Sequence, residues 1–211
     1  MNLAIFGASG GTGRHLVEQA LAAGHRVTVL VRTPTAFGTP TAFAEPHERL
    51  RVVQGDVRQA DQVAAVISGQ DAVLSALGPN ERGPVSLCTE AMTTILAAMA
   101  RHSVRRLVAL SAYGARESHD GGLYNRLLWM MQREKMVDKE RMEELIAHSA
   151  VDWTVVRPPA LTDGPRTPHY RSGTDLRIKV TSRISRADVA DFMLRQVTDT
   201  AYLRTSPAIT A

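Results

Sequence analysis

The sequence has very few of the residues on which several classes of protein depend. Cys88 is the one cysteine in 211 residues, which excludes an intramolecular disulfide and a cysteine-based metal cluster and predicts a reducing, cytoplasmic location. No apolar run approaches the roughly 20 residues of a membrane-spanning helix. Met1 leads directly into a predicted strand. We therefore expect neither a membrane segment nor a signal peptide, and we predict no metal site.

Aromatic residues and lysine are also scarce. Aromatic side chains make up 5% of the chain, and lysine occurs only at positions 135, 139 and 179. Lysine and arginine together outnumber aspartate and glutamate by 25 to 21, for a net charge of +4. These charges are scattered, without a basic stripe that alternates with aromatic residues. The surface therefore suits anionic small molecules, and we predict no nucleic-acid partner.

The first residues of the chain carry the strongest motif. Residues 1–6 predict a buried strand and residues 14–23 a helix, and a glycine-rich turn of the form G-x-x-G-x-x-G joins them. This arrangement is typical of the turn that holds the diphosphate of a dinucleotide, with the positive end of the helix directed at the phosphates. A tight turn without a ligand is the alternative. The residues expected to contact the cofactor are Gly7, Ser9, Gly10, Gly11, Thr12 and Gly13.

The next strand indicates which dinucleotide is bound. Residues 25–31 predict a strand that is followed by Arg32 and Thr33. Proteins that prefer NAD usually have an acidic residue at this point, which accepts a hydrogen bond from the ribose 2′-hydroxyl. An arginine would instead pair with a 2′-phosphate, and Arg14 could assist. We therefore predict NADP(H); the alternative is that Arg32 is simply solvated.

Apolar runs alternate with helical patterns along the whole chain, which predicts a fold of the α/β class. We expect a Rossmann-like, doubly wound and mainly parallel sheet with helices on both faces. Residues 1–211 would form a single NADP-binding domain, with the substrate site built by its C-terminal loops. Residues 33–46 and 158–173 are expected to be long connections. Further strands are predicted at 50–53, 71–77, 106–110 and 152–156, and helices at 59–67, 86–102, 123–148 (long or broken) and 187–197.

Two of the predicted strand ends carry candidate cofactor contacts. Ligands of such sheets bind beyond the carboxyl ends of the strands. Asp56 follows the third strand, where an acid can accept from an adenine amino group or can cap the following helix. Gly78 follows the fourth strand, where it would let the backbone pass close to the cofactor or would form an ordinary turn.

The fifth and sixth strand ends carry candidate catalytic groups. Ser111 and Tyr113 follow the fifth strand, where a hydroxyl could polarise a substrate carbonyl or contact the nicotinamide ribose. A purely structural hydroxyl is the alternative. Pro158 follows the sixth strand, where its carbonyl could face the nicotinamide carboxamide or where the proline could simply block a helix.

With these residues in place, the chain resembles an atypical short-chain dehydrogenase/reductase of the NAD(P)H-binding family. More narrowly, it resembles the biliverdin-IXβ reductase and flavin reductase group. The C-terminal block ISRADVADFMLR makes the resemblance more specific than the glycine turn alone. The stretches that carry it are IFGASGGTG at 5–13, VTVLVR at 27–32, GDV at 55–57, GQDAVLSALG at 69–78, Ser111, the pair Pro158-Pro159 and the block at 184–195.

The resemblance implies a reductase that passes hydride from NADPH to a planar conjugated acceptor, such as a flavin or a linear tetrapyrrole. It also implies a monomer or a weak homodimer. By the family pattern, Gly10, Thr12 and Gly13 bind the diphosphate and Arg32 binds the 2′-phosphate. Asp56 and Val57 would flank the adenine, Leu77 and Gly78 would line the cofactor groove, and Ser111 would lie beside the nicotinamide.

The sequence departs from related enzymes at the proton donor. Ordinary short-chain dehydrogenases carry Tyr-x-x-x-Lys, but the residue four positions before Lys139 is Lys135, and Tyr124 is followed at that spacing by Leu128. The resembled group has a histidine after the proline pair, where this chain has Ala160. Water, Ser111 or Tyr113 remain candidate donors, and a flavin acceptor needs no protein acid.

Residues 118–136 differ from the corresponding segment of the resembled reductases. They contain a bulky apolar patch near the predicted site, formed by Leu123, Tyr124, Leu127, Leu128, Trp129, Met130 and Met131. Its helical spacing favours core packing. The alternative is a flat hydrophobic wall for an aromatic substrate, which would favour a quinone or a polycyclic ketone over a tetrapyrrole.

Three functions remain open on this evidence. The leading one is an NADPH-dependent reductase. The missing tyrosine also fits a non-catalytic NADP(H)-binding regulator or sensor. An epimerase or isomerase, which normally keeps that tyrosine, ranks last.

Overall fold

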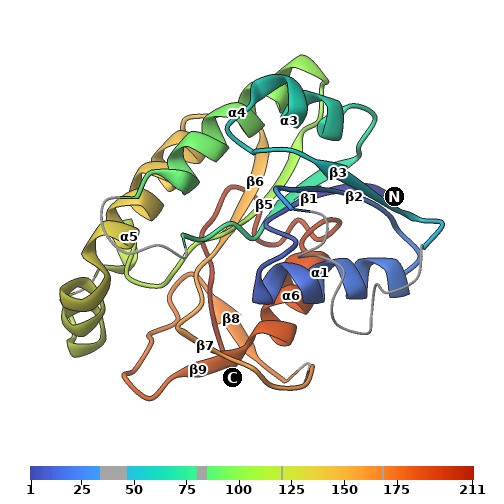
Figure 1. The fold of residues 1–211 in the computed structure, drawn as a ribbon. Coiled ribbons are helices and arrows are strands. Elements are labelled where there is room, and N and C mark those ends of the chain that lie inside the picture. The colour runs from blue at the N-terminus through green and yellow to red at the C-terminus, as the bar shows by residue number, and fades with distance from the viewer. Residues whose placement is uncertain (34–46, 80–84, 120, 168) are drawn as a thin grey trace.

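A six-stranded parallel sheet forms the centre of the molecule (Figure 1). The computed structural model describes residues 1–33, 47–79, 85–119, 121–167 and 169–211, so most of the predicted connection at 33–46 lies outside the described residues. The strand order is β3-β2-β1-β4-β5-β6. The strands are β1 Asn2–Phe6, β2 Arg26–Val31, β3 Leu50–Gln54, β4 Ala72–Ser75, β5 Arg106–Leu110 and β6 Asp152–Val156.

The strand order reverses beside β1, which pairs with β2 on one side and with β4 on the other. Phe6, the last residue of β1, lies opposite Leu30 of β2 and Ser75 of β4. The chain segments that leave these three strands therefore emerge at the same edge of the sheet. In doubly wound sheets this switch point is where ligands bind.

Helices cover both faces of the sheet, as the alternating pattern predicts. Figure 1 shows α1 and α6 on one side and α3, α4 and α5 on the other. Successive residues of β1 point to opposite faces, so Leu3 and Ile5 pack with α1 and α6, whereas Ala4 and Phe6 pack with α3, α4 and α5. The helices are α1 Gly11–Ala22, α3 Ala60–Ile67, α4 Leu87–Arg101, α5 Leu123–Ala147 and α6 Arg186–Arg195, with a short helix η1 at Arg116–Ser118.

Four short strands complete the described part of the chain, and none of them was predicted. They form two pairs, an antiparallel one of β8 with β10 and a parallel one of β7 with β9. The expectation of a plain connection at 158–173 was therefore wrong, because this segment contains β7 and β8. These strands are β7 Ala160–Thr162, β8 Arg171–Gly173, β9 Arg183–Ser185 and β10 Ala208–Thr210.

The predicted class is confirmed: the chain folds as a Rossmann-like α/β domain. Among the described residues, no helix combines the length and the apolar character that a bilayer span requires. In the same residues, no cluster of three or more histidine, cysteine, aspartate or glutamate side chains is arranged to hold a metal ion.

Candidate active site

A cavity of about 840 Å³ opens beyond the carboxyl ends of β1 to β5, at the switch point of the sheet. We call it the main cavity. It brings together most of the residues that the sequence singles out, although they come from five different strand ends. The predicted residues on its wall are Gly7, Ser9, Gly10, Gly11, Thr12, Arg32, Asp56, Val57, Leu77, Gly78 and Ser111.

The glycine turn between β1 and α1 has no room for side chains at its first and last glycines. Gly7 has a φ of +79°, and a Cβ there would lie 2.7 Å from the carbonyl carbon of Ala76. A Cβ on Gly13 would lie 2.0 Å from the carbonyl oxygen of Gly7. Gly13 is buried beneath the turn and is not on the cavity wall. It therefore acts by letting α1 pack against the turn.

The start of α1 is open toward the cavity. Gly10 is its N-cap residue, so no side chain caps the helix, and the first turn contains no acidic residue. The first N–H groups of a helix have no partner within the helix and carry its positive dipole end. Gly10, Gly11 and Thr12 all face the main cavity. The residues present thus fit a dinucleotide, with the diphosphate held at the start of α1.

Two arginines lie on the cavity wall beyond the ends of β2 and β3. Arg32 is exposed at the end of β2, and Arg58 lies on the same wall, with its Nε 2.6 Å from Oε2 of Glu90. Asp56 accepts a hydrogen bond from the backbone N–H of Arg58 at 2.9 Å. The N-cap of α3 is Gln59, so Asp56 does not cap that helix. The carboxylate of Asp56 instead shapes the turn at the cavity edge.

Ser111 carries a buried hydroxyl without a protein partner. Its backbone N–H donates to the carbonyl of Val156 at 2.8 Å, which fixes its position at the end of β5. The residue is 5% exposed and lies on the cavity wall, yet among the described residues nothing bonds its Oγ. An unsatisfied buried hydroxyl is unfavourable. The hydroxyl therefore fits a role toward a bound molecule better than a structural role.

Lys139 of α5 joins the ends of two neighbouring strands. Its Nζ donates to the carbonyl of Leu77 at 2.8 Å and to that of Leu110 at 2.6 Å. The side chain is 7% exposed and borders the cavity. Leu110 directly precedes Ser111, so Lys139 both holds the Ser111 segment and places a positive charge beside it. The one sequence signal for this lysine is the incomplete Tyr-x-x-x-Lys pattern.

The C-terminal half of α5 is anchored by buried charges that sequence reasoning missed. Asp138 accepts from the backbone N–H groups of Cys88 and Thr89, both at 2.9 Å, and so caps α4. Arg157 forms a buried ion pair with Glu143 and a second pair with Glu117. Burial alone would lower the pKa of Arg157, but the hydrogen bonds and charges of the two glutamates raise it above its ordinary value.

The N-terminal half of α5 is an apolar arm at one end of the main cavity. We define this arm as residues 123–131; it ends at a kink at Gln132, whose φ of −135° and ψ of 30° are not helical (Figure 1). Leu123, Met130 and Met131 are 63%, 75% and 76% exposed. Core packing, the favoured expectation, is therefore wrong for these three residues. The arm residues on the cavity wall are Tyr124, Leu127, Leu128 and Met131.

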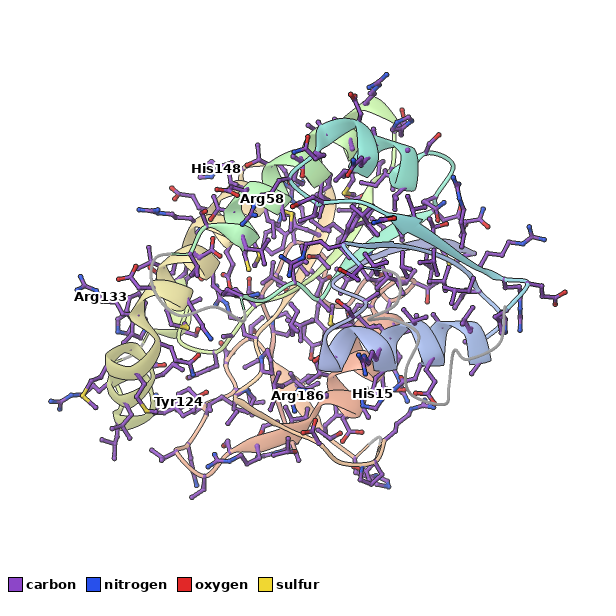
Figure 2. All side chains as sticks on the ribbon, viewed as in Figure 1. His15, Arg58, Tyr124, Arg133, His148 and Arg186 are labelled. Carbon is purple, nitrogen blue, oxygen red and sulfur yellow. The ribbon has the colours of Figure 1, made fainter. Side chains whose placement is uncertain are left out.

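Tyr124 is the ionisable residue among the arm residues on the cavity wall. Its position in Figure 2 is at the arm's side of the molecule, far from α1. Burial raises the pKa of its phenol above the ordinary value, although the nearby charge of Arg183 acts in the opposite direction. The phenol therefore stays neutral near pH 7, and the arm presents an uncharged face to the cavity.

Besides Gly13, two predicted site residues lie outside the cavity wall. Tyr113 is 5% exposed and packs edge-on against Tyr124, with ring centroids 5.9 Å apart. Its backbone N–H donates to the carbonyl of Pro158 at 2.9 Å. Pro158 is buried in the same contact, and Pro159 and Ala160 take its expected place on the cavity wall. The structure thus does not bring Tyr113 or Pro158 to the site.

The fold and the main cavity define a Rossmann-type dinucleotide-binding protein. A family model of NAD(P)H-binding proteins matches residues 7–200, and the chain belongs to this NAD(P)H-binding family. The expected resemblance is therefore confirmed at the level of family and fold.

Individual relatives are distant in sequence. The chain is 21% identical over 210 residues to the chloroplastic protein TIC 62 of Pisum sativum; the match covers 90% of this chain but 39% of TIC 62. Two solved structures share the fold across nearly the whole chain. ChuY, an anaerobillin reductase from Escherichia coli O157:H7, has a TM-score of 0.81 at 21% identity, covering 99% of this chain and 96% of ChuY.

The second structure is a short-chain dehydrogenase/reductase from Veillonella parvula in complex with NADP. Its TM-score is 0.81 at 18% identity, and the alignment covers 100% of this chain and 94% of that protein. At these identities the likeness establishes the fold.

Proposed function

We propose that this protein is an NADPH-dependent reductase that transfers hydride to a planar conjugated acceptor, such as a flavin, a tetrapyrrole, a quinone or a polycyclic ketone. The observation that carries the proposal is the unpartnered, buried hydroxyl of Ser111, a residue on the wall of the main cavity, which also includes the glycine turn and the apolar arm. The cavity thus combines a place for the cofactor, a polar group and an apolar wall.

Arg32 supports NADP(H) as the cofactor. The residue directly follows β2 on the cavity wall, where an NAD-preferring protein would have an acid. Its guanidinium would pair with a 2′-phosphate, and Arg58, which is paired with Glu90, lies on the same wall. Asp56 and Val57 would flank the adenine, and Leu77 with Gly78 would line the groove that leads to Ser111.

When bound, the cofactor would supply the hydride from its nicotinamide C4, while the solvent supplies the balancing proton. The protein's part is to hold the acceptor and to exclude water. Ser111 would donate a hydrogen bond to the oxygen or nitrogen of the acceptor that gains negative charge. The ammonium group of Lys139, held by Leu77 and Leu110, would favour that charge electrostatically.

The acceptor would stack on the apolar arm. Tyr124, Leu127, Leu128 and Met131 offer a wide, uncharged face, and methionine adapts to flat ring systems. We further propose that the protein works in the cytoplasm as a monomer or weak homodimer. Cys88 supports this location, because the single cysteine of the chain is a free thiol.

One observation favours a second candidate, a non-catalytic NADP(H)-binding regulator. Leu123 and Met130 are exposed on the arm and lie outside the cavity wall, so they are available to a partner protein. In that case the protein would bind NADPH without oxidising it.

Oxidation of NADPH by the purified protein distinguishes the two candidates. The loss of reduced nicotinamide absorbance would be followed with a flavin, a biliverdin, several quinones and several polycyclic ketones, with NADH tested in parallel. We expect oxidation with at least one acceptor, faster with NADPH than with NADH. Tight NADPH binding together with no oxidation by any acceptor class would contradict the reductase and favour the regulator.

A further inference from the structure

Arg186 lies across the glycine turn although it is far from that turn in the sequence. It is the first residue of α6, and both Arg186 and Gly11 are on the wall of the main cavity. A Cβ built on Gly11 would lie 2.5 Å from Cδ and 2.8 Å from Nε of Arg186. The side chain of Arg186 therefore occupies the space directly over the first residue of α1.

The backbone around Arg186 is fixed by local structure. Ser185 caps α6, because its Oγ accepts from the N–H of Asp188 at 3.0 Å. Strand β9 pairs with β7 so that Ser185 lies opposite Thr162. The residues that follow this pair, Asp163 and Arg186, therefore emerge next to each other. Figure 2 shows the labelled Arg186 where α6 begins, beside α1.

Asp163 binds the guanidinium of Arg186 but does not occupy all of the N–H donors of that guanidinium. Oδ1 of Asp163 accepts from Nη1 of Arg186 at 2.6 Å, and it is the one hydrogen-bond partner of that guanidinium among the described residues. A guanidinium has five N–H donors in a planar fork. The Asp163 side chain is 90% exposed, so the pair is readily exchanged for a better anion.

We propose that Arg186 is a cofactor-binding residue that closes over the diphosphate from the C-terminal half of the chain. The inference rests on the proposed function for the identity of the ligand. The first N–H groups of α1 would contact the diphosphate from one side, and the guanidinium of Arg186 would contact it from the other. Gly11 has a specific role in this arrangement, because any larger residue would push the arginine away.

The role of Arg186 differs from that of Arg32. Arg32 directly follows β2 on the cavity wall, where it would contact the adenosine part of the cofactor and discriminate between NADPH and NADH. The side chain of Arg186 lies over the start of α1. It would strengthen the binding of both dinucleotides equally, since both contain the diphosphate. Two fragments of the cofactor separate these roles. ADP-ribose contains the diphosphate without a 2′-phosphate, and adenosine 2′-monophosphate contains the 2′-phosphate without a diphosphate.

The test is the affinity of the full chain for the two fragments, measured by calorimetry on the wild type, Arg186→Ala and Arg186→Gln. We expect both variants to bind ADP-ribose about tenfold more weakly than the wild type, because a charge-assisted hydrogen bond to the diphosphate is lost. Their affinity for adenosine 2′-monophosphate should equal that of the wild type. Arg101→Ala is the matched control, because Arg101 is exposed on α4 and is not on the cavity wall. Thermal unfolding verifies that each variant is folded.

A double-mutant cycle tests the contact with Gly11 itself. Gly11→Ala should weaken ADP-ribose binding in the wild type but add little in the Arg186→Ala background. Unchanged ADP-ribose affinity in Arg186→Ala and Arg186→Gln would overturn the inference, and so would equal losses from Gly11→Ala in both backgrounds. These binding results do not depend on turnover, so a protein that binds ADP-ribose through Arg186 but oxidises no NADPH would refute the reductase and leave this inference intact.

Discussion

At the scale of single residues, one part of the main cavity wall carries arginines and another the apolar face of the arm, with Lys135 and Arg183 also on the wall. Arg32 and Arg58 lie beyond the ends of β2 and β3, and Tyr124 and Leu127 lie on the arm. Ser111 is a polar residue on the same wall. Such a wall suits a ligand that combines an anionic cofactor part with an uncharged ring system. Each of these residues would then contact a different part of the ligand, so each role can be measured separately.

Arg32→Asp tests the assignment of the 2′-phosphate. The substitution replaces an attractive charge with a repulsive one, so we expect the dissociation constant of NADPH to rise by about a hundredfold while that of NADH changes by less than about threefold. Fluorescence titration with each cofactor measures both values. Arg101→Asp serves as the control for net charge. Equal weakening of both cofactors by Arg32→Asp would contradict the assignment.

Ser111→Ala tests the proposed hydrogen bond to the acceptor. The variant should lower kcat by about tenfold to a hundredfold with the best acceptor, because one donor to developing charge is lost. NADPH affinity should stay within about twofold of the wild type. Steady-state kinetics and titration measure the two quantities, with Ser68→Ala, an exposed serine at the end of α3, as the control. An unchanged kcat would contradict the proposed hydrogen bond and would show that the hydroxyl of Ser111 has a structural role.

The sequence predicts site residues well where they directly follow a strand and poorly where their partners are distant. Ser111 and Arg32 reach the cavity because the ends of parallel strands meet at one edge of the sheet. The contacts of Lys139 could not be predicted, since its acceptors are backbone carbonyls 62 and 29 residues away. Tyr113, three residues beyond β5, illustrates the limit, because the turn there directs it into the packing against Tyr124.

At the scale of elements, α5 has two halves with different environments. The arm borders the cavity, and the half after Gln132 is buried against α4 and β6. The sequence predicts a long or broken helix over this range, and the structure shows one helix with a kink. The apolar spacing could not distinguish core packing from a cavity wall, because the same pattern serves a helix face in either place.

Leu127→Gln tests the arm as the acceptor site. A polar amide in the apolar face should raise the KM for a planar acceptor by about tenfold, and the affinity for NADPH should not change. Leu123→Gln is the matched control, because Leu123 is on the same arm but not on the cavity wall. Similar effects from both substitutions would show that the arm acts through its general polarity and not through a contact with the acceptor.

Arg157→Met tests the anchor of the buried half of α5. The substitution leaves Glu143, which is 3% exposed, without its ion-pair partner. We expect the free energy of unfolding to fall by about 3–5 kcal/mol, as is typical when one partner of a buried pair is removed. Chemical denaturation measures the change. A loss below about 1 kcal/mol would show that Glu143 is readily solvated or protonated.

At the scale of the whole molecule, the doubly wound sheet follows from sequence patterns, whereas the C-terminal layer does not. Strands β1 to β6 carry apolar runs that are separated by helical patterns. Strands β7 to β10 have three residues each, too few for a periodic pattern, and their pairings join distant parts of the chain. The contact of Arg186 with Gly11 depends on this layer and was therefore missed as well.

Cofactor binding should stabilise the whole domain. A ligand at about a hundred times its dissociation constant stabilises the folded state by about 2.7 kcal/mol, which corresponds to roughly 5–10 °C in Tm for a chain of this size. Thermal unfolding with and without NADPH measures the shift. NADH at the same concentration should give a smaller shift. Equal shifts would contradict a preference for NADPH.

The most direct test of the account is a stopped-flow measurement on the preformed complex of the protein with NADPH. The complex would be mixed with each acceptor, and the decay of reduced nicotinamide absorbance would be compared with that of free NADPH under the same conditions. The account predicts that bound NADPH is oxidised faster than free NADPH by at least one planar acceptor. If bound NADPH is oxidised no faster than free NADPH by any of them, the protein shields its cofactor and is not a reductase for this class of acceptor.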